Sequence, residues 1–253
     1  MARVIAILRA LAEAEEETSL TAIAQQVGLA RSTTHRLLNL LMSEGLVERG
    51  RWHASYRIGV EYMRLASLVV KKRDWQQIAE PFLKGLAETV NETSFLSVYL
   101  PAQRKIMLTQ VHHGKNPLRF QIDQNVPIPI MWGAAGRAVL AFLPDETIAA
   151  ILQEGEPSPA TGAPMKRTVL KAELESIRKQ GYALTQGQLL AGAVGIGAPV
   201  FGPGGHVVGA LCIRFPESRH NQASVNEIAK KLVRQAHRLN AALGNDETRD
   251  SGA

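Results

Sequence analysis

The 253-residue chain has little cysteine, and Cys212 is its single thiol. A disulfide within the chain is therefore impossible, and a cysteine-based zinc site lacks its ligands. A lone thiol is typical of a reducing compartment, so we expect a cytoplasmic protein that holds no metal or other cofactor. A secretory leader is not expected either, because the opening "MARVIAILRALAEAEEE" turns acidic after one short amphipathic run.

The chain also lacks a hydrophobic run suited to a membrane helix. Residues 191–213 are apolar except for His206, but they include two prolines and seven glycines. A lipid-exposed helix does not tolerate that density of helix breakers. Two strands around the "GPGG" turn explain the segment better, and no membrane association is expected.

Positive charge is in excess and unevenly placed. The 29 Lys and Arg outnumber the 23 Asp and Glu, for a net charge of +6. Nine of the basic residues but only three of the acidic ones lie between residues 31 and 73. Such a segment suits a polyanion such as nucleic acid, although a solvated basic surface would have the same composition.

Two short helices joined by a tight turn are predicted inside this region. After a first helix over 3–15, Thr21 is expected to cap a helix over 22–27, and "GLA" then breaks the pattern. A further helix runs from about Ser32 to Glu44. This arrangement is typical of a helix-turn-helix.

The second of these helices has an unusual polar face. The leucines at 37, 38, 40 and 41 are expected on its core side. The opposite stripe consists of Ser32, His35, Arg36 and Asn39, which follow each other at helical spacing. A face that is merely solvated would more often use Glu and Lys, whereas these side chains reach phosphates and base edges.

A basic hairpin is predicted to follow. In "LVERGRWHASYRIG", residues 46–59, two short β-prone runs flank a turn from Gly50 to His53. Arginines at 49, 51 and 57 could lie along a sugar-phosphate backbone, as the wing of a winged helix does. Trp52 would either pack inward or contact the groove at the wing tip.

The segment "SLTAIAQQVGLARSTTHRLLNLLMSEGLVERGRWHASYRIG" resembles the winged helix-turn-helix of the IclR family of bacterial transcriptional regulators. Two later blocks, "VPIPIMWGAAGRAVLAFLP" and "KQGYALTQGQLLAGAVGIGAPVFGPGGHVVGALCIRFP", resemble blocks of that family's effector domain. The resemblance covers nearly the whole chain. It implies an α+β protein in which a linker helix joins the winged domain to a GAF-like antiparallel-sheet effector domain.

The expected organisation has four parts. Residues 1–59 form the DNA-binding domain, 60–74 a linker helix at a dimer contact, 75–244 the effector and oligomerisation domain, and 245–253 a flexible tail. Within the effector domain, strands are predicted over 94–100, 105–111, 118–122, 182–186, 194–201 and 206–215. Helices are predicted over 75–91, with a kink or restart at Pro81, and over 133–143, 168–180 and 222–243.

Double-stranded operator DNA is the expected macromolecular partner. The residues predicted to contact it are Arg31, Ser32, Thr33, Thr34, His35, Arg36, Arg49 and Arg51. Arg31, Arg49 and Arg51 are expected on phosphates, and the others on bases or phosphates. A homodimer or dimer of dimers would read a near-palindromic site.

A small-molecule site is implied by the resemblance. In family members that bind small acids, the cavity is lined by positions that match Ala134, Ala135, Thr185, Gly195, Cys212 and Arg214. The free N–H groups at the start of the "GAAGRA" helix could hold an anion. This chain departs from the family pattern because "LTQGQ" replaces a usually acidic segment and Arg214 replaces a common serine.

The arginine predicts a carboxylate effector, with aromatic acids among the candidates. A buried guanidinium needs a partner, and a ligand carboxylate could supply it through two parallel hydrogen bonds. Alternatively, Arg214 could pair with Asp123 or Glu217, or reach solvent at the strand end.

The sequence shows no clear pattern of catalytic or metal-binding residues. No base is recognisable near Cys212, so it is expected to be a small buried hydrophobe rather than a nucleophile. His112 and His113 are adjacent, so on a strand they would face opposite ways and share no metal. The rivals to a ligand-responsive regulator are a constitutive DNA-binding protein and, less favoured, an enzyme acting on a small acid.

Overall fold

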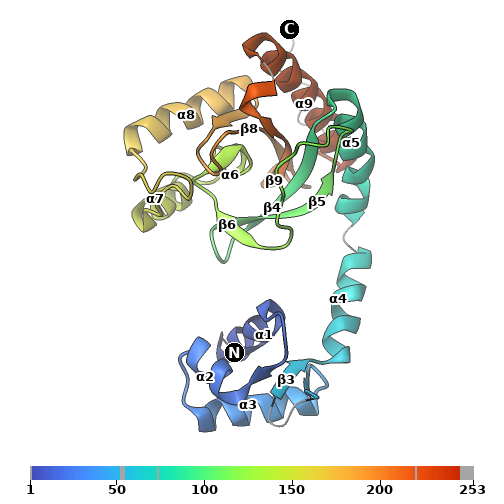
Figure 1. Cartoon of the computed structure of the whole chain (residues 1–253), viewed down its shortest axis with the longest axis vertical. Coiled ribbons are helices and arrows are strands. Elements are labelled where there is room, and N and C mark those ends of the chain that lie inside the picture. Colours follow the sequence, from blue (N-terminus) through green and yellow to red (C-terminus); the bar gives the residue numbers. More distant parts are fainter. Residues whose placement is uncertain (1, 52–54, 73, 220, 246–253) are drawn as a thin grey trace. The chain divides into compact units, whose positions relative to one another are not determined.

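The computed structural model describes residues 2–51, 55–72, 74–219 and 221–245. The chain divides into two compact units, Met1–Asp74 and Trp75–Ala253 (Figure 1). The α+β class predicted from the sequence is confirmed by the arrangement of elements in the two units.

The first unit is a small helical domain with a three-stranded antiparallel sheet of order β1-β3-β2. Its elements are α1 (Ala2–Glu13), β1 (Thr18–Ser19), α2 (Leu20–Gln26), α3 (Arg31–Ser43), β2 (Val47–Arg49), β3 (Ser55–Ile58) and α4 (Val60–Lys72). The predicted helix-turn-helix and hairpin are confirmed. The cap of α2 is Ser19 rather than Thr21, because the Ser19 hydroxyl accepts the Ala22 N–H at 3.2 Å.

A single apolar cluster holds the first unit together. Ile7 and Leu11 of α1, Ile23 of α2 and Leu38 of α3 are buried against Tyr56 of β3. Removing this apolar surface from water is what fixes α3 against the sheet and leaves its opposite face outside.

The second unit is built on a six-stranded antiparallel sheet of order β6-β5-β4-β9-β8-β7. The strands are β4 (Thr93–Leu100), β5 (Lys105–His112), β6 (Pro127–Pro129), β7 (Ala183–Gln186), β8 (Ala193–Phe201) and β9 (Val207–Pro216). The apolar run 191–213 therefore forms the β8–β9 hairpin, as predicted. Among the described residues, no helix is long and apolar enough to cross a membrane.

Helices cover both faces of this sheet (Figure 1). They are α5 (Asp74–Val90), α6 (Gly133–Leu140), α7 (Asp145–Glu154), α8 (Arg167–Gln180) and α9 (Gln222–Ala242). One core lies between the sheet and α5 with α9, and the other contains α6, α7 and α8. Figure 1 shows the sheet curling around α6, all of whose residues are buried.

The close packing of α6 on the sheet depends on a glycine. A Cβ at Gly197 of β8 would lie 2.7 Å from the carbonyl oxygen of Ala134. Only glycine allows the start of α6 to approach the strand so closely. This approach sets the distance between the helix start and the strands that form the pocket described below.

Several predicted elements differ from the structure. Residues 118–122 do not form a strand: Leu118 has no strand partner, and its carbonyl accepts a hydrogen bond from the Arg219 guanidinium instead. Helix α7 and strand β6 were not anticipated. Helix α5 continues through Pro81, because its buried residues on either side pack on the sheet. Asn245, the first residue of the predicted tail, is buried, and the rest of that tail lies outside the described residues.

Candidate functional sites: the α3 surface and an arginine-lined pocket

The polar stripe predicted on α3 is exposed. Ser32, His35, Arg36 and Asn39 all lie at the surface, and the Asn39 amide lies 3.4 Å from His35 Nδ1. Arg31, the first residue of the helix, is exposed as well. The exposed surface of α3 therefore presents two cations, Arg31 at the helix start and Arg36 on the stripe, five residues later.

Two residues of α3 lie elsewhere than the sequence predicted. Thr34 is fully buried, and its hydroxyl donates to the Ala30 carbonyl at 3.1 Å. It stabilises the first turn of the helix and is not on the exposed stripe, so its assignment as a DNA contact is corrected. Leu40 was expected in the core but is 54% exposed, because it follows Arg36 by four residues and shares its face.

The wing carries three exposed arginines, Arg49, Arg51 and Arg57. The guanidinium carbon of Arg49 lies 4.9 Å from the centroid of the Tyr56 ring, which holds the side chain along β3. Arg51 follows the strand, and its backbone N–H donates to Glu17 at 2.6 Å. The predicted wing tip, including Trp52, lies outside the described residues.

Glu17 organises the base of the wing, and sequence reasoning missed it. Its carboxylate also accepts the Ser55 hydroxyl at 2.9 Å, so it joins both ends of the hairpin. A Cβ at Gly50 would lie 2.1 Å from the Glu17 Oε2 atom, so a larger residue there would push the Glu17 carboxylate out of these contacts. The acidic run at 15–17 gave no sign of this role, because the contact spans more than thirty residues.

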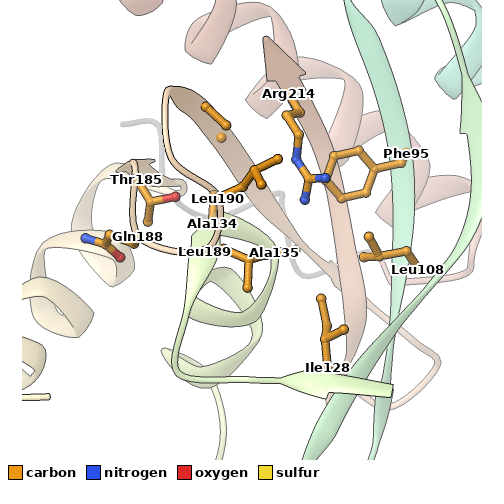
Figure 2. Close-up of a pocket in the computed structure, with 13 residues that line it drawn as sticks. Phe95, Leu108, Ile128, Ala134, Ala135, Thr185, Gln188, Leu189, Leu190 and Arg214 are labelled. Carbon is orange, nitrogen blue, oxygen red and sulfur yellow. The ribbon is translucent and has the colours of Figure 1, made fainter. Parts of the chain in front are cut away.

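The second unit contains a pocket at the start of α6 (Figure 2). Its polar and small residues include five of the six predicted ligand positions, namely Ala134, Ala135, Thr185, Gly195 and Arg214. Strand register brings three of them together: Thr185 of β7 pairs with Gly195 of β8, which pairs with Arg214 of β9. Side chains of directly paired residues share one face of a sheet, so this row points toward α6.

Cys212 does not line the pocket. It is fully buried in the core two residues before Arg214, on the same sheet face. Burial raises the pKa of its thiol far above the usual range. The predicted ligand contact is corrected, whereas the interpretation of Cys212 as a small buried hydrophobe agrees with its position.

Arg214 reaches over an aromatic ring inside the pocket. Its guanidinium carbon lies 5.1 Å from the centroid of Phe95, and Figure 2 shows Ala134 and Ala135 across the pocket from it. Burial lowers the pKa of the guanidinium, and the charges of Cys212 and Asp123 act in the opposite direction. In the described part of the chain Arg214 forms no ion pair. Glu217 instead accepts the Gln186 amide.

The pocket is narrow in this structure. Its free volume is about 30 Å³, on the order of the space of one water molecule in the liquid. Leu189 and Leu190, from the loop between β7 and β8, line it together with Ile128 and Leu108. The Ser158 hydroxyl donates to the Gln188 carbonyl at 2.7 Å and holds that loop in place.

A buried arginine behind the pocket was also missed by sequence reasoning. Arg137 of α6 is only 2% exposed, and its Nε donates to the Met131 carbonyl at 3.1 Å. Its guanidinium forms an ion pair with Glu173 of α8, which ties the pocket helix to its outer neighbour. Burial lowers the pKa of Arg137 to about 10.

The histidine pair has separate surroundings. His112 lies 3.7 Å from the Glu80 carboxylate, whereas the His113 ring is 3.1 Å from the Thr93 hydroxyl. Burial, with Arg119 and His112, lowers the pKa of His113. Among the described residues, no group of three His, Cys, Asp or Glu side chains is placed to hold a metal ion.

Both units match models of known protein families. Residues 1–51 match the model of the IclR helix-turn-helix domain, and residues 67–241 match that of the bacterial transcriptional regulator IclR C-terminal domain. The chain belongs to the IclR family of transcriptional regulators. The family resemblance seen in the three sequence blocks is thus confirmed, and α3 is the second helix of the helix-turn-helix in an IclR-type domain.

Individual members of the IclR family align along nearly the whole chain. The regulator TtgV of Pseudomonas putida is 31% identical over 244 residues, covering 96% of this chain and 91% of TtgV. The transcriptional repressor IclR of Escherichia coli is 26% identical over 245 residues, covering 96% and 89%. These relatives are named as regulators rather than enzymes.

Solved structures share the fold. An IclR transcriptional regulator from Alicyclobacillus acidocaldarius superposes with a TM-score of 0.79 at 22% identity, covering 95% of this chain and 96% of its own. An IclR homologue from Microbacterium hydrocarbonoxydans, solved in complex with 4-hydroxybenzoate, gives a TM-score of 0.75 at 22% identity and covers 95% and 98%.

Proposed function

We propose that this IclR-family protein is a ligand-responsive regulator whose affinity for operator DNA changes when a small organic acid binds beside Arg214. The observation that carries the proposal is the partly buried Arg214 guanidinium, which faces a pocket and has no ion-pair partner among the described residues. A buried unpaired cation is costly, and a carboxylate ligand removes that cost.

The chemistry of the pocket fits a carboxylate. Arg214 offers a planar fork of donors, and backbone N–H groups at the start of α6 lie across the pocket near Ala134. Trp132, at the cap of α6, has an indole N–H that donates to the Glu156 carbonyl and offers no acceptor, so its side chain leaves the first N–H groups of the helix uncapped. The bound 4-hydroxybenzoate of the Microbacterium relative makes an aromatic acid a reasonable first probe.

Operator contacts are proposed on the exposed face of α3 and on the wing. Ser32, Thr33, His35 and Arg36 would contact bases or phosphates in the major groove. Arg31, Arg49 and Arg51 would hold the phosphate backbone. If each protomer neutralises about four phosphates, the logarithm of the dimer's operator affinity should fall with the logarithm of salt concentration with a slope of about −7.

A homodimer is proposed because helix α4 leaves apolar residues uncovered. Val60 is 68% exposed and Met63 is 65% exposed, and Leu65 and Leu68 are exposed as well. Large exposed apolar side chains gathered on one helix indicate a protein interface. Two copies would present two α3 helices to half-sites about 34 Å, or a multiple of that distance, apart.

A panel of aliphatic and aromatic carboxylates, screened by thermal shift on the full chain, tests the sensor function. A ligand at a hundred times its dissociation constant adds about 2.7 kcal/mol, or roughly 5–10 °C in a protein of this size. A hit must also change the affinity for an operator selected from random DNA, by 5-fold to 150-fold at a coupling of about 1–3 kcal/mol. If no stabilising ligand changes the affinity for the operator, the proposal is overturned.

The constitutive alternative rests on one observation, the small free volume of the pocket. In that case the second unit only oligomerises, and no carboxylate shifts the melting temperature. The same screen therefore separates the two functions.

A further inference from the structure

A second groove lies at the other end of α6. It has a volume of about 560 Å³ and is bounded by the end of α8, the end of β8 and one side of α9. Phe142, two residues after α6, forms part of its wall. Unlike the pocket beside Arg214, this groove is open and has room for a ring-sized molecule.

Basic side chains line one part of the groove. Arg178 and Lys179 at the end of α8, together with His237 of α9, line it, and its lining within the described residues includes no carboxylate. Lys179 and His237 form no ion pair among those residues. Arg178 donates through Nε to the Ala141 carbonyl, and the one carboxylate near it, on Asp145, is 97% exposed at 3.8 Å. The local charge therefore favours an anion.

The floor of the groove is apolar and aromatic. The rings of Phe142 and Phe201 meet edge to face, with centroids 5.2 Å apart, and both are half-buried. Asn240 of α9 accepts the Phe201 N–H and donates to the Pro199 carbonyl, which fixes this wall. An aromatic ring packs well against such a pair, since ring faces and edges carry opposite partial charge.

We propose that this groove is a second binding site, for a small aromatic carboxylate or a similar aromatic anion. The ring would pack on Phe142 and Phe201, and the anionic group would lie against Lys179 and His237. The site is separate from the Arg214 pocket, because the eight residues of α6 between them extend about 12 Å.

Equilibrium dialysis of labelled benzoate tests the site in the full-length Arg214→Met protein, where the first pocket has lost its anchor. We expect one benzoate per chain to remain bound. Adding Lys179→Gln together with His237→Gln should weaken that binding by at least ten-fold. Phe201→Leu should weaken it by about 2-fold to 10-fold, because the ring contact is lost while the apolar volume stays. Lys171→Gln, which removes the same charge two turns earlier on α8, serves as the matched control and should leave binding unchanged.

The outcomes separate this site from the proposed sensor. Benzoate binding that is absent in the Arg214→Met protein, or that survives the Lys179 and His237 substitutions unchanged, overturns the second site and leaves the sensor function standing. Binding that depends on Lys179 and His237 in the Arg214→Met protein supports the second site, even if no ligand is found for the first pocket.

Discussion

The guanidinium of Arg214 lies over the ring of Phe95, at 5.1 Å from its centroid, and the two residues belong to neighbouring strands of the same sheet. This contact keeps the cation inside the pocket without neutralising its charge. The aromatic face stabilises the guanidinium modestly, by about 0.5–2 kcal/mol, and leaves its N–H edge available to a ligand.

Replacing Arg214 by methionine should abolish the stabilisation by carboxylates that remains when the second groove is disabled by Lys179→Gln and His237→Gln. Methionine keeps a long unbranched side chain and removes a partly buried charge that has no ion-pair partner among the described residues, so the ligand-free protein should melt no earlier than the wild type. Differential scanning fluorimetry with and without the best carboxylate of the screen measures both effects. A carboxylate-dependent shift that persists when Arg214→Met is combined with Lys179→Gln and His237→Gln would place the anchor of the first pocket elsewhere, with the start of α6 as the next candidate.

Substitutions on the DNA-binding surface should separate base contacts from phosphate contacts. Arg51→Ala should weaken binding to every sequence and reduce the salt slope from about −7 to about −5, because each dimer loses two phosphate contacts. Arg36→Ala should cost about 1–3 kcal/mol per lost base contact and relax sequence preference. Arg9→Ala, on the exposed side of α1, is the matched control. Fluorescence anisotropy at several salt concentrations gives the slopes, and a slope near zero for the wild type contradicts the interface.

Shortening Leu189 should admit larger acids to the Arg214 pocket. Leu189 lines a space of about 30 Å³ and is only partly buried, so Leu189→Ala enlarges the pocket at little cost to folding. We expect aromatic acids to bind this variant about ten-fold more tightly than the wild type, a difference of about 1.4 kcal/mol. Leu184→Ala, a leucine of the neighbouring strand that does not line the pocket, is the control. If Leu189→Ala and Leu184→Ala bind aromatic acids with equal affinity, Leu189 does not limit access to the pocket.

Neutralising Glu173 should destabilise the second unit. The Arg137 guanidinium is buried, so Glu173→Gln leaves a buried charge without its carboxylate. Because the Glu173 side chain is 37% exposed, we expect a loss of about 1–3 kcal/mol, or roughly 2–10 °C in melting temperature. Glu175→Gln, on the exposed side of the same helix, should change little. The double variant with Arg137→Met should be more stable than Glu173→Gln alone, and a simple sum of the two losses would contradict the pairing.

Cys212 should be unreactive in the folded protein. Its thiol is fully buried and its pKa is raised by burial, so little thiolate forms at neutral pH. Titration with a chromogenic disulfide reagent should detect no thiol in the native protein and one per chain in denaturant. If the Cys212 thiol of the native protein reacts rapidly with the reagent, the core around Cys212 opens readily to solvent.

Local patterns in the sequence predicted many of the helices and strands. The period of the apolar residues was enough to predict α3, α8 and α9, and alternation was enough for β4, β5, β8 and β9, because each of these elements buries one face against a core. The strand predicted over 118–122 shows the limit of alternation. The pattern was present, but a strand also needs a neighbour to complete its hydrogen bonds, and β5 pairs with β6 instead.

The sequence by itself determined the family, the helix-turn-helix and the stripe of Ser32, His35, Arg36 and Asn39, because a helix has one regular period and its faces follow from spacing alone. Only the tertiary structure decided which residues share a pocket. Thr185, Gly195 and Arg214 meet through strand register, Glu17 reaches the wing across more than thirty residues, and Arg137 finds Glu173 on another helix. Such contacts depend on how distant segments pack, and no local pattern in the chain encodes them.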